Sequence, residues 1–327
     1  MLISILIPTR NRERELKILL DSISSCCRNL YEKFSFPFEV IIYDSGEEED
    51  DGSIGVVEDF KRENPYIPIS YIWARQSPDI KLRTMVQRAK GAYCWFMGSD
   101  DEVIPEAFRN FCEFLLTKPI RKIVQVNFQD YDKDIKLPLG QEVIFPWVYK
   151  DFVSAEDFLH ESKGRYGFMG ATLYSTQLLK LTMIQTPYKE GFYFISSLLI
   201  VLKNPSQHAT IYAPVILKRR MANTCWGNSG GDYIRNLINR VRLIDLMEEF
   251  KYGRFTVDKW RWDNYFQLYE SILAGRFRGL RKEDNVYTTI KRKYDGRIVR
   301  TISWLLLNVP IHRKILSFLK YLNNQFS

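Results

Sequence analysis

The first third of the chain alternates short apolar runs with longer stretches of helical periodicity. Residues 2–8 (LISILIP) are almost entirely apolar and rich in β-branched side chains, which predicts a fully buried strand. In residues 10–26, Leu16, Leu19 and Ile23 recur at helical spacing, which predicts a helix with one buried face. The same criteria predict strands over residues 38–46, 69–74, 92–97 and 122–128, and helices over 54–64, 80–91 and 104–119. This alternation predicts an α/β fold with a mostly parallel sheet and helices on both of its faces.

Two residues mark expected helix ends. Pro105 suits the first turn of the helix over 104–119, because its missing N–H has no helical partner there. Gly91 is predicted to close the helix over 80–91 as a C-cap. Beyond residue 128 the pattern loosens, and we expect a helix over 155–162, a strand running into a helix over 167–181, and a helical region from residue 232 onward.

Polar clusters follow three of the predicted strands at the point where each strand ends. They are PTRNR (residues 8–12), DSGEEEDD (44–51) and GSDD (98–101). In open α/β sheets, ligands bind outside the carboxyl ends of the strands. We therefore expect these clusters to border a binding site, although each one alone is also compatible with a solvated turn.

The GSDD cluster places two adjacent carboxylates, Asp100 and Asp101, at a strand end. Mg²⁺ and Mn²⁺ favour oxygen ligands and commonly bridge carboxylates to substrate phosphates. A metal site with Asp100 as first ligand and Asp101 beside it is one interpretation. The alternative is that one of the two caps the following helix, whose positive end favours a carboxylate.

Several classes of site have no support in the sequence. The phosphate-binding pattern GxxxxGK[ST] is absent, and no GxGxxG follows the first strand. The five cysteines form neither a CxxC pair nor a disulfide framework, which favours a reducing compartment. The three histidines are too scattered for a His-rich zinc site. No secretory signal is evident, and the longest apolar run, residues 192–202, is about half the length that spans a bilayer.

The formal charge of +8 is concentrated at the end of the chain. Residues 251–327 carry 16 Lys and Arg against 6 Asp and Glu, a net charge of +10, so residues 1–250 carry −2. Such a basic segment indicates an anionic partner, which could be a membrane surface, a nucleic acid or a phosphorylated substrate. No nucleic-acid-binding motif accompanies it, so we expect no nucleic-acid partner.

Three segments resemble the family 2 (GT-A fold) glycosyltransferases. ISILIPTRNRERELKILLDSI is similar to the family's opening strand, loop and helix, and FEVIIYDSGEEEDDGS to its second strand and acidic turn. AKGAYCWFMGSDD resembles the segment that carries the DxD-type metal motif. The resemblance covers mainly residues 1–118, and within the family it is nearest to bacterial O-antigen enzymes of the abequosyltransferase-like type. It implies a nucleotide-sugar-binding half over residues 1–118, an acceptor-binding half over 119–231 and a helical basic region over 232–327.

The resemblance also implies roles for individual residues. Asp44 would contact the base or ribose of the nucleotide, Asp79 would lie near it, and Asp100 would bind Mg²⁺ or Mn²⁺ joined to the diphosphate. Three positions depart from the family pattern: Gly98 stands at the first acidic position of DxD, Ser77 replaces a common Gly, and Arg10 replaces the usual aromatic residue after PT. The residues expected to border the nucleotide after the first strand are Pro8, Thr9, Asn11 and Arg12.

An inverting transferase needs a carboxylate to accept the proton of the attacking hydroxyl. The family often supplies it from a Glu-Asp pair, and Glu190 is the nearest candidate here, although no Asp follows it. The alternative is an exposed loop glutamate, and Asp157 and Glu161 are poorer candidates for the base. A basic group near residue 220 is interpreted either as a mobile segment over the diphosphate or acceptor, or as a basic strand end with a packed Trp; it comprises Lys218, Arg219, Arg220, Asn223 and Trp226.

Residues 297–327 contain no acidic residue and combine apolar clusters with basic side chains. Such an amphipathic segment can lie in a membrane interface, or it can pack on the catalytic domain with its charges in water. We therefore expect a cytoplasmic protein. If residues 297–327 lie in a membrane interface, the protein is peripheral on the inner face of the cell membrane. The leading hypothesis is a metal-dependent glycosyltransferase acting on a glycan or lipid-linked acceptor; the alternative is a non-catalytic nucleotide- or glycan-binding module.

Overall fold

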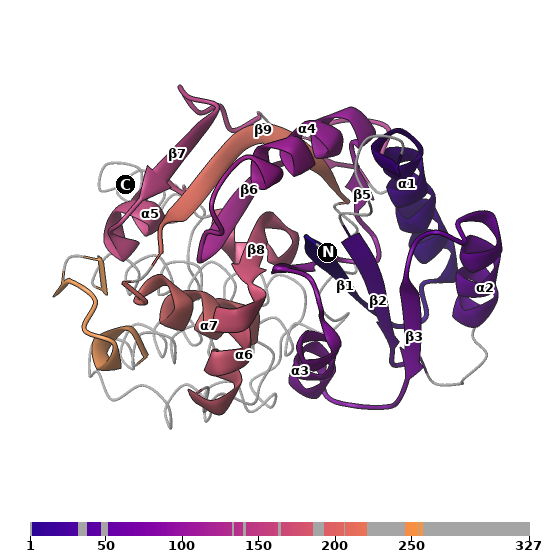
Figure 1. Ribbon diagram of the computed structural model, residues 1–327, viewed down its shortest axis with the longest axis horizontal. Helices are drawn as coiled ribbons and strands as arrows, with labels where there is room; N and C mark the ends of the chain where they lie inside the picture. Colours follow the sequence, from indigo (N-terminus) through magenta and orange to yellow (C-terminus); the bar gives the residue numbers. More distant parts are fainter. Residues whose placement is uncertain are drawn as a thin grey trace, which may run out of the picture. The chain divides into compact units, whose positions relative to one another are not determined.

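The structure, a computed structural model, describes residues 2–31, 38–46, 52–132, 134–139, 142–162, 165–185, 193–205, 207–220, 246–254 and 256–257. The chain divides into two compact units, residues 1–223 and 224–327. The first unit contains the sheet and its flanking helices (Figure 1). The predicted boundaries at residues 118 and 231 stay predictions.

The described residues form a mixed, nine-stranded sheet in the order β3-β2-β1-β4-β8-β6-β9-β5, with β7 paired to β9. β1, β2, β3 and β4 are mutually parallel, and the antiparallel β8 separates β4 from β6. Because β6 is antiparallel to β8 and parallel to β9, the strands β6 and β9 run in the same direction as β4. The strands are β1 (Ile3–Thr9), β2 (Phe38–Asp44), β3 (Ile69–Trp73), β4 (Tyr93–Phe96), β5 (Glu102–Val103), β6 (Ile123–Tyr131), β7 (Tyr149–Phe152), β8 (Thr172–Ser175) and β9 (Ala209–Arg220).

Helices cover both faces of this sheet, as the sequence predicts (Figure 1). One group packs together beside β5 and β9 and consists of α1 (Glu13–Tyr31), α2 (Ser53–Glu63) and α4 (Pro105–Leu116). The other group packs beside β1, β8 and β6 and consists of α3 (Pro78–Arg88), α6 (Thr176–Gln185) and α7 (Tyr193–Leu202). The short helices are α5 (Ala155–Glu161) and the two 3₁₀ turns η1 (Arg165–Gly167) and η2 (Met169–Ala171).

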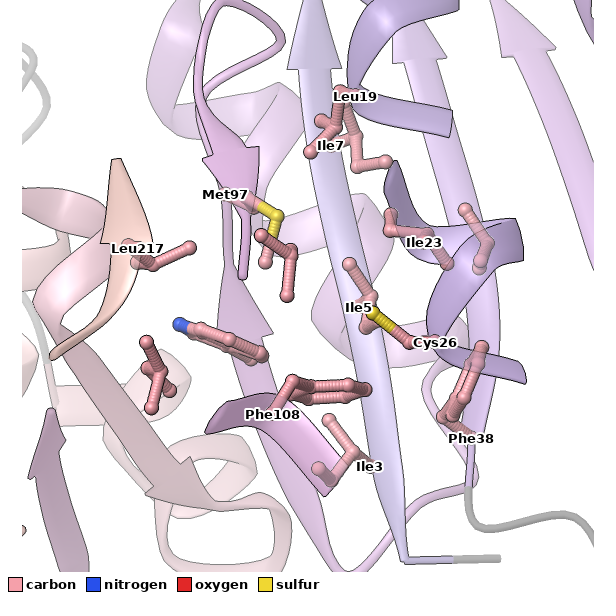
Figure 2. Packing of buried hydrophobic residues seen from close by; sticks show 14 of the residues in the cluster. Ile3, Ile5, Ile7, Leu19, Ile23, Cys26, Phe38, Met97, Phe108 and Leu217 are labelled. Atoms are coloured by element: carbon pink, nitrogen blue, oxygen red, sulfur yellow. The ribbon is translucent and has the colours of Figure 1, made fainter. Parts of the chain in front are cut away.

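The core between β1 and its covering helices follows the two periodicities seen in the sequence. Figure 2 shows Ile3, Ile5 and Ile7, alternate residues of β1, facing side chains of α1 and α4. Every second residue of a strand points to one face, so these three enter one cluster together with Leu19 and Phe108. Burial of each such side chain contributes about 1.5–3 kcal/mol, and it fixes the strand ends that carry the polar clusters.

The predicted helix end at Gly91 is wrong. The helix α3 ends earlier, and its C-cap is Ala89. A Cβ atom on Gly91 would lie 2.5 Å from the backbone nitrogen of Ser4 and 2.6 Å from the carbonyl carbon of Ile3. Gly91 is therefore needed for the close approach of this loop to β1, and its N–H donates a 2.8 Å hydrogen bond to Ser4 Oγ.

The other predicted elements of the first unit are present within a few residues of their expected bounds, and Pro105 opens α4 as predicted. The antiparallel placement of β8 and the short strands β5 and β7 are not in the sequence-based prediction. Among the described residues, no helix is both long and apolar enough to cross a membrane. The predicted amphipathic segment over residues 297–327 lies outside the described residues.

Candidate active site

The polar residues that follow β1, β2 and β4 lie at the same edge of the sheet. β1 is the central strand of the three and pairs in parallel with both neighbours. Thr9, the last residue of β1, is the register partner of Asp44, the last residue of β2. Leu6 of β1 pairs with Phe96, so the chain after β4 emerges beside the loop after β1. Of the acidic turn after Asp44, residues 47–51 lie outside the described residues.

Asp44 is fully buried and accepts two hydrogen bonds. Its Oδ1 accepts the N–H of Gly46 at 2.8 Å, which closes the turn after β2, and its Oδ2 accepts the hydroxyl of Tyr71 at 3.1 Å. Tyr71 is the middle residue of β3, so the carboxylate at the end of β2 is tied to the neighbouring strand. Contact between Asp44 and a nucleotide stays a prediction.

Lys81 is a functional candidate that the sequence-based search missed. Its Nζ donates to the backbone oxygen of Thr9 at 3.2 Å and to Ser45 Oγ at 2.7 Å, so it ties the ends of β1 and β2 together. Burial lowers the pKa of Lys81 to about 8; the nearby charge of Asp44 opposes this, and Arg10 and Arg12 lower the pKa further. The helical periodicity of the sequence could have indicated that Lys81 is buried, because position 81 falls on the same buried face of α3 as Met85.

Asp79 lies in the first turn of α3 and is buried. The carboxylate is electrostatically favourable there because the first turn carries the positive end of the helix dipole. Ser77, which departs from the family pattern, is the N-cap of this helix and accepts the N–H of Ile80 at 3.5 Å. Asp79 lies two residues before Lys81, which contacts the end of β1, and its place near a nucleotide stays a prediction.

Arg12 reaches from the loop after β1 to the carboxylates after β4. Its Nη1 lies 2.8 Å from Asp100 Oδ2, and the side chains of Arg12 and Asp100 are 32% and 15% exposed. The preceding residue, Asn11, has a positive φ of 51°, a backbone conformation that asparagine tolerates better than most residues. Pro8 and Thr9 precede this turn, and the buried hydroxyl of Thr9 has no hydrogen-bond partner. The structure therefore brings the predicted residues of the first loop together with Asp100.

Asp101 lies beneath Asp100 and is only 2% exposed. Burial raises the pKa of Asp101 well above its usual range; the charge of Asp100 raises it further, while Arg219 and the backbone N–H groups of Gly98 and Arg220 oppose the shift. Its Oδ2 is buried and has no hydrogen-bond partner. An acceptor atom that is buried without a donor is costly unless another group satisfies it.

Gly98 makes room for both carboxylates. A Cβ atom at this position would lie 2.8 Å from Asp101 Oδ2 and 2.9 Å from Asp100 Oδ1. The carboxyl groups of Asp100 and Asp101 lie close to the position that the Cβ atom of a larger residue 98 would occupy. An acidic residue, as in the DxD pattern, would therefore contact both of them here.

The alternative interpretation of these aspartates as helix caps is wrong. The N-cap of α4 is Ile104, which makes no side-chain capping bond, and the strand β5 separates it from Asp101. The residues present instead fit a divalent cation, because an unsatisfied, buried carboxylate oxygen lies beside a second, partly exposed carboxylate. Within the described part of the chain no cluster of three or more acidic, Cys or His side chains could hold a metal. Such an ion would therefore need further ligands from a substrate.

Three members of the predicted basic group, Lys218, Arg219 and Arg220, form the end of β9. Lys218 pairs with Glu102 at 2.8 Å, and Arg219 pairs with Asp130 through two bonds of 2.6 and 2.7 Å. Arg220 lies 3.6 Å from Glu15. Asn223 and Trp226, which belong to the same predicted group, lie outside the described residues.

The predicted base cannot be placed, because Glu190 also lies outside the described residues. The two poorer candidates are on α5. Asp157 is exposed there, and Glu161 pairs with Lys150 at 3.4 Å. Described carboxylates at or near the sheet edge include Asp44, Asp79, Asp100, Asp101 and Asp130.

Comparison with known proteins identifies the family of the chain. Residues 4–180, more than half of the chain, match the family described as Glycosyl transferase family 2. The chain belongs to this family. This membership favours the enzyme hypothesis over the alternative of a non-catalytic binding module.

One known relative is similar to part of the chain. Over 111 residues the chain is 39% identical to abequosyltransferase RfbV of Salmonella typhimurium (strain LT2). The matched stretch is 33% of this chain and 30% of that protein, so the chain matches less than a third of that relative's length.

Solved structures share the fold at low sequence identity. S. aureus TarS 1-349 in complex with UDP-GlcNAc has a TM-score of 0.56 and 15% identity, covering 94% of this chain and 82% of that chain. The mannosyltransferase PcManGT from Pyrobaculum calidifontis, in complex with GDP-Man and Mn²⁺, has a TM-score of 0.55 and 13% identity, covering 93% and 83%. Together they confirm the predicted α/β, GT-A-like architecture.

Proposed function

We propose that this glycosyltransferase moves a sugar from a nucleotide-sugar donor to a lipid-linked glycan acceptor during assembly of a bacterial surface polysaccharide of the O-antigen type. The observation that carries the proposal is the convergence of Asp44, Lys81, Arg12 and Asp100 at one sheet edge. The partial likeness to an abequosyltransferase supports the class of product. A cytoplasmic location, with the basic end of the chain against the membrane, is part of the same proposal.

Donor binding would use the edge from β2 to β4. Asp44 and Asp79 would face the nucleoside, and the loop of Pro8, Thr9 and Asn11 would border it. The buried, unpaired hydroxyl of Thr9 supports this assignment, since a bound polar group would satisfy it.

Asp100 and Asp101 would hold a divalent cation, Mg²⁺ or Mn²⁺, and the structure of PcManGT in complex with GDP-Man and Mn²⁺ supports metal use in this fold. When bound, such a cation neutralises negative charge on a departing diphosphate. Arg12, paired with Asp100, lies where it would meet the same phosphates.

We propose that transfer inverts the anomeric carbon and that Glu190 is the base. In this step the acceptor oxygen forms its bond to the anomeric carbon while the bond from that carbon to the diphosphate oxygen breaks. The proton of the acceptor hydroxyl passes to the carboxylate of Glu190, and the bonding electrons leave with the diphosphate.

A panel assay tests the proposal. The full chain is incubated with nucleotide sugars, Mn²⁺ or Mg²⁺ and a lipid-linked acceptor, and the product is analysed by mass spectrometry. We expect D100A to lower transfer roughly 100-fold or more, as loss of a group that stabilises transition-state charge does. The matched control is D59A, because Asp59 is an exposed carboxylate of α2 that pairs only with Arg62 in the described structure. Undiminished transfer by D100A would remove the metal assignment.

A further inference from the structure

The carboxyl end of β6 and β9 holds two guanidinium groups against one phenyl ring. The guanidinium carbon of Arg165 lies 4.0 Å from the centre of the Phe128 ring, and that of Arg219 lies 4.7 Å from the same centre. Arg219 also lies 5.1 Å from the ring centre of Phe168. The face of an aromatic ring attracts cations, so the ring stabilises each guanidinium group. The two positive charges nevertheless repel each other.

The two arginines differ in how their hydrogen-bond donors are used. Arg219 donates Nε and Nη2 to the two carboxylate oxygens of Asp130, its register partner on β6. Arg165 is 9% exposed, its Nε is buried without a partner, and no described residue accepts a hydrogen bond from its guanidinium group. Asp130 and the exposed Glu142 lie within electrostatic range of Arg165, but neither makes an ion pair with it in the described part of the chain. Because a guanidinium group only donates, its buried donors require an acceptor that the described residues do not supply.

The position of this pair along the sheet indicates which substrate would supply the acceptor atoms. Asp44 ends β2, the paired aspartates follow β4, and Arg219 is the last residue but one of β9. These strands are arranged in that order across the sheet. Arg219 acts electrostatically on Asp101, so this arginine lies near the carboxylates, and the strand order puts it on the side away from Asp44. If the nucleotide lies toward Asp44, the acceptor has to approach from the side of β6 and β9.

We propose that Arg165 and Arg219 form a binding site for a phosphate-type oxyanion carried by the acceptor substrate. The inference rests on the proposed function, because that function assigns the opposite side of the carboxylates to the donor. Guanidinium groups match the geometry of phosphate oxygens and bind them through paired, charge-assisted hydrogen bonds. Asp130 orients Arg219, and the ring of Phe128 supports both cations. A lipid diphosphate and a phosphorylated sugar present the same chemistry to this site.

Phosphate binding by the full chain, followed by ³¹P NMR line broadening of inorganic phosphate in EDTA, tests the site. EDTA removes divalent cations, so phosphate cannot be held through a metal at Asp100. We expect R165Q and R219Q each to weaken binding roughly 10- to 100-fold, as loss of a charge-assisted hydrogen bond does. R165K should retain part of the affinity because it keeps the charge. The control is R109Q, which removes a charge from α4 where Arg109 pairs with Glu106.

Two further measurements identify the source of the anion and separate this proposal from the proposed function. Farnesyl diphosphate and glucose 1-phosphate are titrated in the same way, and the tighter ligand assigns the site to a lipid diphosphate or to a phosphosugar. Donor binding is measured separately by thermal shift with Mn²⁺, so a failed transfer assay leaves the phosphate result intact. Equal phosphate binding by wild type, R165Q and R219Q, each folded by circular dichroism, would overturn the site.

Discussion

Arg12 Nη1 lies 2.8 Å from Asp100 Oδ2, so a guanidinium group of the first loop occupies a carboxylate oxygen that is proposed to hold a metal. A guanidinium and a divalent cation compete for the same oxygen. Binding of the cation therefore requires Arg12 to release Asp100, and the released guanidinium is then available to substrate phosphates. The ion pair couples the loop after β1 to the carboxylates after β4.

Replacement of Arg12 should consequently strengthen metal binding in the absence of nucleotide. An ion pair that is partly exposed contributes up to about 1 kcal/mol, so R12Q should bind Mn²⁺ roughly 5-fold more tightly. The measurement is an EPR titration of free Mn²⁺. R14Q is the control, since Arg14 is an exposed neighbour that makes no ion pair in the described structure. The same variant should bind nucleotide sugar more weakly, and unchanged Mn²⁺ affinity would show that Arg12 does not compete for Asp100.

G98A should separate metal binding from stability. The new Cβ atom would lie 2.8 and 2.9 Å from carboxylate oxygens of Asp101 and Asp100, which can rotate away. We expect Mn²⁺ affinity to fall about tenfold while the free energy of unfolding changes by less than about 1.5 kcal/mol. G55A is the control because a Cβ on Gly55, in α2, meets no atom within 4 Å. That variant should keep its metal affinity and be slightly more stable, since alanine favours the helix.

G91A should destabilise the fold without touching the site. Its Cβ atom would lie 2.5 and 2.6 Å from backbone atoms of β1, which cannot rotate away as a side chain can. We expect a loss of about 1–3 kcal/mol or more in the free energy of unfolding, measured by urea denaturation. A loss below that range would show that the loop moves off β1 at little cost.

The same glycine shows what sequence periodicity can and cannot reveal. The helix over 80–91 was predictable because its apolar positions repeat along one face, but a glycine after a helix has the same signature whether it caps the helix or passes close to a strand. Only the placement of β1 distinguishes the two. The antiparallel β8 was missed for a related reason, because alternation of strands and helices does not encode which strand lies between β4 and β6.

The candidate site was predictable where its residues follow strands directly. Asp44, Asp100 and Asp101 lie at the sheet edge because a buried apolar run precedes each of them. Lys81 and Arg165 were missed, since both come from helical segments and reach the edge only through tertiary packing. A single charged residue on a helix is normally solvated, so its burial is a property of the fold and not of the local pattern.

The buried amine of Lys81 gives the last prediction, which concerns pH. Folding lowers the pKa of Lys81 from 10.5 to about 8, so between these values the unfolded chain binds a proton that the folded chain does not. The charged amine therefore costs stability below about pH 8, and this cost disappears as the pH rises through the unfolded value.

Relative to K81M, which has no such group, the wild type should gain roughly 2 kcal/mol in the free energy of unfolding between about pH 7.5 and about pH 9.5. Urea denaturation of both proteins at the two pH values measures the difference, and other titrating groups cancel in it. K17M is the control because Lys17 is exposed on α1 and pairs with Asp21 at the surface. A difference between wild type and K81M that stays constant with pH would mean that Lys81 remains charged at the end of β1, held by Asp44 more strongly than its burial opposes.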